Sequence, residues 1–347
     1  MVYRIQYQQK KEKKTMIFVI GDIHGMLDPL KNLIWKIEDK CKRGEDIEEL
    51  IFLGDYIDYG PNSKEVIDYI TALPYKKTFL AGNHEDLLLQ FFHGEIRSEN
   101  FSESNWLRDN EGYRTVRSFG GTLDYGITPE NVAERVGGGY MDFFENLLYI
   151  HEREIDGQKY LFTHAHASER MLDKFLLSVR YDEFHKCLRE NDIYPYFTPI
   201  WERKDCEFEK PEKEFGKIRD YVVIHGHTPV AGMYKTPEYV QKYRTPYVEV
   251  NRPAEAKAIK MAEYIGEESI FEFDAKIGDI YGINIDTGIS IGHGLSAIGI
   301  KTGRSKSYWR DESDSEDKIE YTIIQALSDR MNKMDAYMRY YKYRIPK

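Results

Sequence analysis

The sequence predicts an α/β protein in which helices pack around a largely parallel sheet. Near the N-terminus, apolar and β-branched runs alternate with stretches whose apolar residues recur at helical spacing, in units of about thirty residues. Such alternation is typical of βαβ packing. With 347 residues, 41% of them apolar, the chain can bury a substantial core as one large domain or two smaller ones.

Three strand–helix units carry this prediction. The strands are expected at TMIFVIGD (15–22), ELIFLGD (49–55) and KKTFLAGN (76–83). The helix after each strand presents an apolar face, formed by Leu30, Leu33, Ile34, Ile37 and Cys41 in the first, by Val66, Ile67, Ile70 and Leu73 in the second, and by Leu87, Leu88, Phe91 and Phe92 in the third. His84 is expected to open the third helix.

The remainder of the chain predicts further strands separated by insertions. These strands are expected at 147–154, 159–165, 221–227, 280–288 and 295–301. A turn at Asp156-Gly157 joins the first two, and the last two have the form of a hairpin. The insertions, which are polar, helical or rich in tyrosine and charge, are expected at about 93–145, 168–218 and 230–278.

The two ends of the chain differ in composition from the main domain, which we expect over 16–310. Residues 1–15 include a basic run and are expected to form a flexible segment. Residues 311–347 begin with an acidic linker, DESDSED, and continue into an expected amphipathic helix whose apolar face comprises Ile319, Ile323, Leu327, Met331, Met334 and Met338. Such a helix usually docks on its own domain, and docking on a protein partner is the alternative.

Bulk properties exclude several classes of protein. The formal charge of −10 argues against nonspecific binding to duplex nucleic acid. No apolar run approaches the ~20 residues of a membrane helix, and the N-terminus lacks an apolar signal region. Three widely spaced cysteines, Cys41, Cys187 and Cys206, indicate neither a disulfide framework nor a cysteine-type zinc site. These features predict a cytoplasmic protein without membrane or nucleic-acid partners.

Polar residues follow the predicted strands in five similar strings. The strings are GDIHG (21–25), GDYIDYG (54–60), AGNHE (81–85), THAH (163–166) and HGH (225–227), and they contain six of the ten histidines. Alone, GDIHG is equally typical of a strand-to-helix turn and of a metal site. Because ligands bind at the carboxyl ends of strands in open α/β sheets, the five strings together favour the metal site.

The residue types in these strings suit a pair of divalent ions. Six side chains offer carboxylate, amide or imidazole donors, namely Asp22, His24, Asp55, Asn83, His164 and His227. Without a thiolate, this set favours Mn²⁺, with iron or Zn²⁺ as alternatives, over copper. A carboxylate such as Asp55 can bridge two ions ~3.5–4 Å apart, and a water between such ions becomes a hydroxide nucleophile near neutral pH.

In this order the strings resemble the calcineurin-like metallophosphoesterases, and among them the phosphoprotein phosphatases and their bacterial relatives. That family reads GDxHG, GDxxDRG, GNHE, HA or HG, and GH, and the resemblance covers roughly residues 16–300. NIDTG (284–288) and GLSAI (294–298) also resemble the closing hairpin of the bacterial members. The resemblance implies a central β-sandwich of two mixed sheets flanked by helices, to which this chain would add helical insertions and a C-terminal helix.

The resemblance also implies a role for each residue of the site. Asp22 and His24 would bind the first ion, Asp55 would bridge, and Asn83, His164 and His227 would bind the second. His84 would be the general acid that protonates the leaving oxygen after attack by a metal-bridging hydroxide, oriented by Asp58. The alternatives are that Asp58 caps a turn and that Asn83 is a turn residue. His166 and His225 would lie behind the ligands or face solvent.

Two departures from the family pattern affect substrate binding. Tyr59 stands where the family has a phosphate-binding arginine, and a phenol offers one hydrogen bond without charge. Arg203 in PIWERKD (199–205) resembles a second phosphate-binding arginine of bacterial relatives and is our candidate, whereas Arg114 and Arg117 are weaker ones. Pro229 replaces the further histidine of the nuclease and phosphodiesterase branch, which favours the phosphatase branch.

These observations lead to three functional hypotheses. The first is a metal-dependent phosphatase that hydrolyses phosphomonoesters, with phosphoserine and phosphothreonine proteins as substrates. The second is a symmetrical dinucleoside-tetraphosphate hydrolase or another nucleotide phosphoesterase. As a class, those hydrolases keep the arginine that Tyr59 replaces and lose the acid equivalent to Asp58, which favours the first hypothesis. The third is a metal-binding regulatory pseudo-enzyme, which the retained His84–Asp58 pair disfavours.

Overall fold

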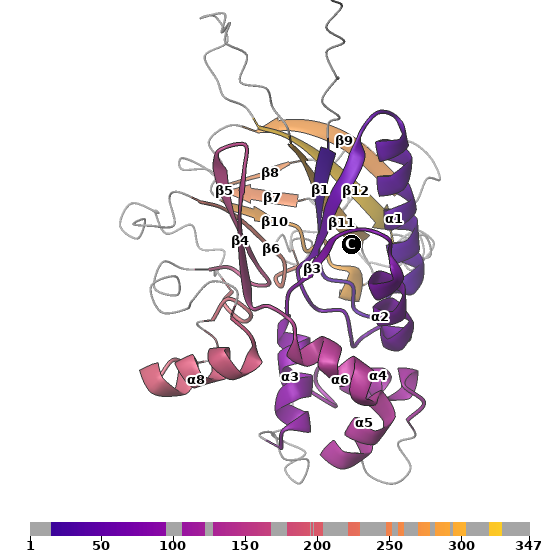
Figure 1. Cartoon of the computed structure of the whole chain (residues 1–347), viewed down its shortest axis with the longest axis vertical. Helices are drawn as coiled ribbons and strands as arrows, with labels where there is room; N and C mark the ends of the chain where they lie inside the picture. Colours follow the sequence, from indigo (N-terminus) through magenta and orange to yellow (C-terminus); the bar gives the residue numbers. More distant parts are fainter. Residues whose placement is uncertain are drawn as a thin grey trace, which may run out of the picture.

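The computed structural model describes the chain over residues 15–94, 106–121, 128–167, 179–194, 196, 198–203, 221–229, 248–251, 256–259, 270–277, 282–291, 294–302 and 319–327. Two six-stranded mixed sheets form its centre, with helices around them (Figure 1). This architecture confirms the expected metallophosphoesterase sandwich and replaces the single, largely parallel sheet that strand–helix alternation alone predicts.

The first sheet has the strand order β3-β2-β1-β11-β12-β9. Its members are β3 (Lys77–Phe79), β2 (Asp46–Phe52), β1 (Thr15–Ile20), β11 (Gly294–Thr302), β12 (Ile319–Leu327) and β9 (Ile270–Ile277). The pairs among β1, β2 and β3 are parallel, and the pairs on the other side of β1 are antiparallel. The parallel half contains the three strands of the predicted strand–helix units.

The second sheet has the strand order β4-β5-β6-β10-β7-β8. Its members are β4 (Ile150–Ile155), β5 (Gln158–Thr163), β6 (Tyr221–His225), β10 (Gly282–Asn284), β7 (Val248–Asn251) and β8 (Ala256–Ile259). Strands β4 and β5 form the predicted hairpin, in which Asp156 and Gly157 both adopt positive φ. The neighbouring pairs β5–β6 and β6–β10 are parallel.

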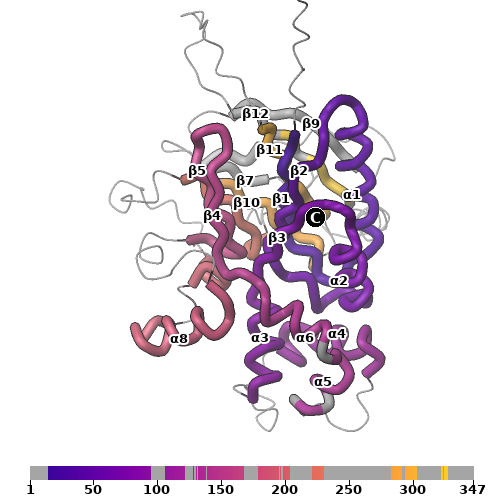
Figure 2. Tube along the Cα trace, viewed as in Figure 1, coloured from indigo at the N-terminus to yellow at the C-terminus, as the bar shows by residue number. Residues whose placement is uncertain are grey.

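The first sheet joins distant parts of the chain. Strand β1 pairs with β11 along its whole length, so that Thr15 lies opposite Thr302 and Ile20 opposite Ala297 (Figure 2). Residues 16–20 are completely buried, in agreement with their continuous apolar sequence. The polar string that follows β1 therefore projects from a core to which both ends of the main domain contribute.

Helices cover the sheets and one end of the molecule. Helix α1 (Leu27–Lys42) packs against β2, β11 and β12 and lies beside α2 (Ser63–Ala72). Figure 1 shows a helical cap at one end, formed by α3 (Asn83–Phe92), α4 (Gly112–Ser118), α5 (Pro129–Val136) and α6 (Gly138–Glu145), with α8 (Tyr181–Asn191) to one side. The helices expected in the first two insertions are thus present.

The predicted C-terminal helix is wrong over its first residues, because Ile319–Leu327 is strand β12. The spacing of Ile319, Ile323 and Leu327 fits a helix, but the segment pairs with β11 on one side and β9 on the other. Thr322 and residues 324–326 are completely buried there. Residues 328–347, the acidic linker and residues 1–14 lie outside the described part of the chain.

Two further expectations change. The segments 280–288 and 295–301 do not form a hairpin, because β10 belongs to one sheet and β11 to the other. The stretch 230–278 contains β7 and β8 of the second sheet and β9 of the first, so it contributes to both sheets. Across the described residues, no helix combines the length and the apolar character that crossing a bilayer requires.

Candidate active site

The predicted site residues converge from five strand ends. Asp22 and His24 follow β1, Asp55 and Asp58 follow β2, Asn83 and His84 begin α3 after β3, His164 follows β5, and His227 follows β6. All eight side chains are buried, with at most 5% of any residue exposed. The side chains come together as expected, but the strand ends belong to two sheets and not to the single edge of one sheet.

The backbone at this edge adopts conformations that most residues avoid. His24, Asp55, Asp58, Tyr59 and His227 all have positive φ, between 48° and 70°. A left-handed conformation is costly for residues other than glycine, although least so for Asp, Asn and His, and such residues cluster at active sites. The turns thus accept local strain to direct these side chains to one point.

Two glycines of the strings permit close approach of the loops. A Cβ atom at Gly82 would lie 2.0 Å from Oδ1 of Asp55, and one at Gly226 would lie 2.1 Å from Oδ1 of Asp22. Any side chain at these positions would displace a carboxylate of the site. The glycines of GNHE and HGH are therefore required by packing against Asp55 and Asp22.

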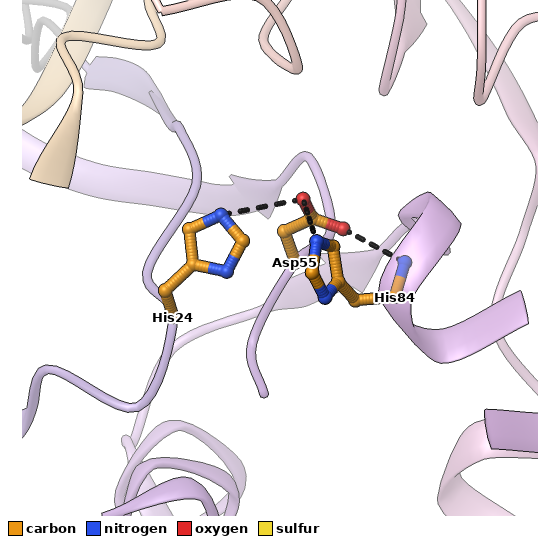
Figure 3. A group of neighbouring side chains, drawn as sticks. All are labelled: His24, Asp55 and His84. Atoms are coloured by element: carbon orange, nitrogen blue, oxygen red, sulfur yellow. Dashed lines mark hydrogen bonds and ion pairs between the residues drawn. The ribbon is translucent and has the colours of Figure 1, made fainter. Parts of the chain in front are cut away.

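The first ligand group comprises His24, Asp55 and His84, whose donor atoms all lie within 4.8 Å of one another. Figure 3 shows both imidazoles next to the Asp55 carboxylate, with one carboxylate oxygen joined to each ring by a dashed line. Oδ2 of Asp55 lies 3.4 Å from Nε2 of His24 and 3.9 Å from Nε2 of His84. Nδ1 of His24 donates to the Ile57 carbonyl at 3.1 Å, which leaves Nε2 with its lone pair toward Asp55.

The second ligand group comprises Asp55, His164 and His227. Nε2 of His164 lies 3.4 Å from Oδ2 of Asp55, and its Nδ1 donates to the Leu53 carbonyl at 2.9 Å. Oδ1 of Asn83 lies 3.0 Å from Nε2 of His164 and 2.8 Å from Nδ1 of His227. Asp55 therefore belongs to both groups, as a bridging ligand must.

Buried negative charge surrounds these groups. The carboxylates of Asp22 and Asp286 are 2% and 3% exposed, and neither group includes Asp22. Burial, together with the charges of Asp286 and Asp55, raises the pKa of Asp22 well above its usual value. Burial likewise raises the pKa of Asp286 to about 6, with Asp55 adding to the effect. Such a set of carboxylates is stable in ionised form only beside cations.

The donor set fits divalent metal ions. Burial lowers the pKa of His24 to about 4 and that of His227 well below its usual value, so both imidazoles are neutral, as metal ligands must be. The fixed tautomers of His24 and His164 direct Nε2 toward Asp55. Oxygen and imidazole donors without thiolate suit manganese, iron or zinc.

His84 of the first ligand group also forms a hydrogen-bonded pair with Asp58. Nδ1 of His84 donates to Oδ2 of Asp58 at 2.7 Å. Burial by itself lowers the pKa of His84, but the carboxylates of Asp55 and Asp58 outweigh it and raise the pKa to about 9. A protonated imidazole is a poor metal ligand and a competent proton donor, so the raised pKa and the bond to Asp58 favour the acid role over ligation.

Two residues of the helical cap fix Asp58. Nε1 of Trp106 donates to Oδ2 of Asp58 at 2.9 Å, and Oγ1 of Thr115 in α4 donates to Oδ1 at 2.5 Å. The main-chain N–H of Asp58 in turn donates to Oγ1 of Thr115 at 2.9 Å. Asp58 has no exposed surface, so these bonds replace all of its hydration.

Glu85 connects the loop after β2 to the start of α3. Its buried carboxylate accepts hydrogen bonds from the main-chain N–H groups of Asp55 and Tyr56, both at 2.8 Å, and of Gly82 at 2.9 Å. It also accepts a longer hydrogen bond from the N–H of Ile57 at 3.3 Å. The fourth residue of GNHE thus holds the Asp55 loop against the helix that begins at Asn83.

Tyr59 and Arg203 lie at the edge of the site. The Tyr59 ring contacts the rings of His24 and His84, at centroid distances of 4.9 and 5.2 Å. Burial and nearby carboxylates raise the pKa of Tyr59 to about 12, so its hydroxyl stays protonated. Nε of Arg203 donates to Nε2 of His227 at 3.3 Å, which places a guanidinium next to the second ligand group.

The other candidates lie outside the two ligand groups. His166 and His225 contact each other, with ring centroids 5.6 Å apart. Arg114 pairs with Glu111, and Arg117 lies over the ring of Tyr113. Sequence reasoning missed the contributions of Trp106, Thr115, Glu85 and Asp286. For Glu85 and Asp286 a signal was present, since both stand in quoted motifs, whereas no local pattern marks Trp106 or Thr115.

Comparison with known proteins agrees with this geometry. The family model for calcineurin-like phosphoesterases matches residues 15–250. An asymmetrical bis(5'-nucleosyl)-tetraphosphatase PrpE of Oceanobacillus iheyensis is 27% identical over 232 residues, which cover 62% of this chain and 77% of that protein. A symmetrical bis(5'-nucleosyl)-tetraphosphatase of Legionella pneumophila is 39% identical over 77 residues, covering 22% of this chain and 26% of that protein.

Among solved structures, a metallophosphoesterase from Sphaerobacter thermophilus aligns over 96% of both chains, with 15% identity and a TM-score of 0.41. The family match extends over more than half of the chain and includes all five polar strings. The chain therefore belongs to the calcineurin-like phosphoesterase family and is a metal-dependent phosphoester hydrolase.

Proposed function

We propose that this chain hydrolyses nucleoside polyphosphates of the dinucleoside-tetraphosphate class at a two-metal site. The observation that supports the chemistry is the position of Asp55, whose Oδ2 lies 3.4 Å from an imidazole of each ligand group. The support for the substrate comes from relatives named bis(5'-nucleosyl)-tetraphosphatase, one of which aligns over 77% of its length. This substrate was the second hypothesis from the sequence.

The proposed ligand assignment keeps the second group, with Asn83 added, and changes the first, where Asp22 takes the place of His84. Asp22 and His24 would hold one ion, Asn83, His164 and His227 would hold the other, and Asp55 would serve both. Manganese is our first choice, with iron or zinc as alternatives. When bound, the ions supply positive charge that binds the phosphate and activates water.

His84 and Asp58 form the proton-delivery part of the site. His84 donates its Nε2 proton to the oxygen that leaves phosphorus. Asp58 accepts a hydrogen bond from Nδ1 at 2.7 Å. This bond orients the ring, and the negative charge of Asp58 stabilises the protonated form of His84. A regulatory pseudo-enzyme would have no chemical need for this buried pair, which supports an active enzyme.

Substrate phosphate would contact Arg203, Asn83 and Tyr59. Arg203 contributes the positive charge, since Tyr59 supplies only a neutral hydroxyl at the family's arginine position. The main-chain start of α3 at Asn83 adds the positive end of a helix dipole. A longer anionic substrate with several phosphates compensates for the missing arginine through contacts with both ions and Arg203.

Phosphoserine and phosphothreonine proteins are the second candidate, and the His84–Asp58 pair favours them. An alkoxide leaving group needs a proton in the transition state, whereas a nucleotide leaving group is stable as an anion. General acid catalysis therefore matters more for the phosphoprotein. Conversely, hydrolysis of a dinucleoside tetraphosphate could proceed with only a weak dependence of its rate on His84.

The test is a side-by-side assay of the Mn²⁺-loaded protein with diadenosine tetraphosphate, a phosphoserine peptide and p-nitrophenyl phosphate. We expect the highest kcat/KM for diadenosine tetraphosphate. The products distinguish the two modes of cleavage, because asymmetrical hydrolysis yields ATP and AMP and symmetrical hydrolysis yields only ADP. A higher kcat/KM for the phosphopeptide would replace the proposal with the second candidate.

A further inference from the structure

Three aromatic side chains form a continuous series after α8, which we call the aromatic ladder: Tyr194, Tyr196 and Trp201. The rings of Tyr194 and Tyr196 have centroids 5.3 Å apart, and those of Tyr196 and Trp201 lie 5.7 Å apart. Trp201 is half-buried and packs against the core, which gives the ladder a rigid base.

The aromatic ladder ends at the metal-ligand groups. The Trp201 ring contacts the ring of His227, with centroids 6.0 Å apart and the planes nearly perpendicular. Arg203, two residues further along the chain, donates to Nε2 of the same histidine at 3.3 Å. A planar surface and a cationic group therefore lie side by side at the second ligand group.

The outer part of the ladder is exposed. Tyr194 and Tyr196 expose 61% and 54% of their surface. In the described part of the chain, the one other large hydrophobic side chain exposed to this degree is Trp35, at 55%, on α1. Neighbouring exposed rings beside a polar site are typical of ligand-binding surfaces.

We propose that the aromatic ladder is a base-binding subsite, on which the nucleobase of a nucleoside phosphate stacks while its phosphate lies at Arg203. This inference deepens the proposed function and rests on it for the identity of the natural substrate. Every base has a π-face, so stacking on tyrosine and tryptophan needs no base-specific hydrogen bond. A phosphopeptide can also place its phosphate at an arginine, but the rest of its affinity comes from main-chain hydrogen bonds at a strand edge or from a groove and not from base stacking.

The test compares two probes that differ only in the base, AMP and ribose 5-phosphate. Their binding to the full, Mn²⁺-loaded chain is measured by calorimetry. We expect the wild type to prefer AMP by about tenfold in Kd, since stacking on an aromatic side chain contributes about that much per base.

Tyr196→Ala should abolish this preference by weakening AMP binding, and Tyr196→Phe should restore it, because phenylalanine keeps the ring. Trp35→Ala is the matched control and should leave the preference at the wild-type value. Thermal unfolding and metal content of each variant show that the site is intact.

Equal affinity of the wild type for the two probes would overturn the subsite, as would an undiminished preference in Tyr196→Ala. Tighter binding of a phosphoserine peptide with an adjacent aromatic residue than of AMP, lost in Tyr196→Ala, would also overturn it in favour of a peptide surface. Failure of the proposed function is distinguishable: a normal AMP preference without tetraphosphate hydrolysis would support the subsite and reject that substrate.

Discussion

The metal-ligand groups and the acid pair lie side by side but are held in different ways. His24 and His164 each donate Nδ1–H to a main-chain carbonyl of a strand-end loop, Ile57 in one case and Leu53 in the other. Asp58, which orients His84, is held instead by side chains of the helical cap, Trp106 and Thr115.

This difference separates two contributions to catalysis. The imidazoles of His24 and His164 are oriented by loop carbonyls at the edge of the sandwich, and the Asp55 loop is held by Glu85 in the first turn of α3. Proton delivery depends in addition on Trp106 and Thr115, which belong to the helical end of the molecule outside both sheets (Figure 1). Variants in the first region should therefore lose metal, and variants in the second should lose proton transfer while keeping metal.

The largest effect is expected for Asp55→Asn. Asp55 belongs to both ligand groups, so its loss should reduce the metal content from about two ions per chain to one or none and abolish hydrolysis. Metal affinity should fall by more than the ~10–100-fold typical of residues that only support a ligand. Metal analysis after dialysis checks this, with the exposed Asp142→Asn as control. Two retained ions would contradict the bridging role.

His84→Asn should lower the rate by ~10²–10⁴-fold on an alkyl phosphate and keep both ions. The loss should be smaller on p-nitrophenyl phosphate, whose leaving group needs less protonation. Rates and metal content are measured on the same preparation. Equal losses on the two substrates would exclude the acid role of His84. Loss of metal would assign His84 to metal ligation.

Trp106→Phe should reduce kcat on the alkyl phosphate by about tenfold, with KM and metal content near the wild-type values. The variant removes one hydrogen bond to a buried carboxylate, an interaction of about 1.5–3 kcal/mol. Thr115→Val removes the other bond to the carboxylate together with the acceptor of the Asp58 main-chain N–H, so its effect should be at least as large. A change in metal content in either variant would show that the cap also supports the ligands.

The smallest effect is expected for Asp286→Asn, which should change how the free energy of unfolding of the metal-free protein depends on pH. The pKa of Asp286 is raised to about 6 from the usual 3.8, so the folded state binds the proton more tightly than the unfolded state. Protonation of Asp286 therefore stabilises the folded state. This contribution to the free energy of unfolding is fully present below about pH 3.8 and is lost as the pH rises through about 6. At pH 7.5, Asp286→Asn should therefore be more stable than the wild type by about 1–3 kcal/mol.

Urea unfolding in the presence of a chelator, at pH 5 and pH 7.5, measures this difference. The difference in stability between Asp286→Asn and the wild type should be smaller at pH 5 than at pH 7.5. It should also be smaller with added Mn²⁺, which compensates the negative charge of Asp286. A difference that is independent of both pH and metal would mean that Asp286 does not contribute to the buried charge of the site.

The sequence could predict the metal-ligand groups because their geometry follows from strand ends. Asp55, His164 and His227 each follow an apolar run, and parallel pairing brings such positions to the carboxyl edge of a sheet. The structure adds that two such edges, one from each sheet, supply the same ligand group. The residues that bond to the carboxylate of Asp58 could not be predicted from strand ends. Trp106 and Thr115 lie 48 and 57 residues from Asp58, and their contacts depend on how the cap docks.

Strand β12 shows the same limit at the level of secondary structure. Ile319, Ile323 and Leu327 satisfy a helical period, while Thr322, Ile324 and Ala326 satisfy a strand period equally well. Only the partners β11 and β9, which are distant in the sequence, decide between the two patterns. The polar stretch 230–278 contributes strands to both sheets for the same reason.

The carboxylate of Glu85 has a consequence for how the site opens. Because one side chain holds the main-chain N–H groups of Asp55, Tyr56 and Gly82, the loop after β2 and the first turn of α3 cannot separate one bond at a time. Their amide hydrogens should exchange with solvent in a single opening event, with one shared protection factor. Release of metal by local opening would then be an all-or-none fluctuation of both segments together.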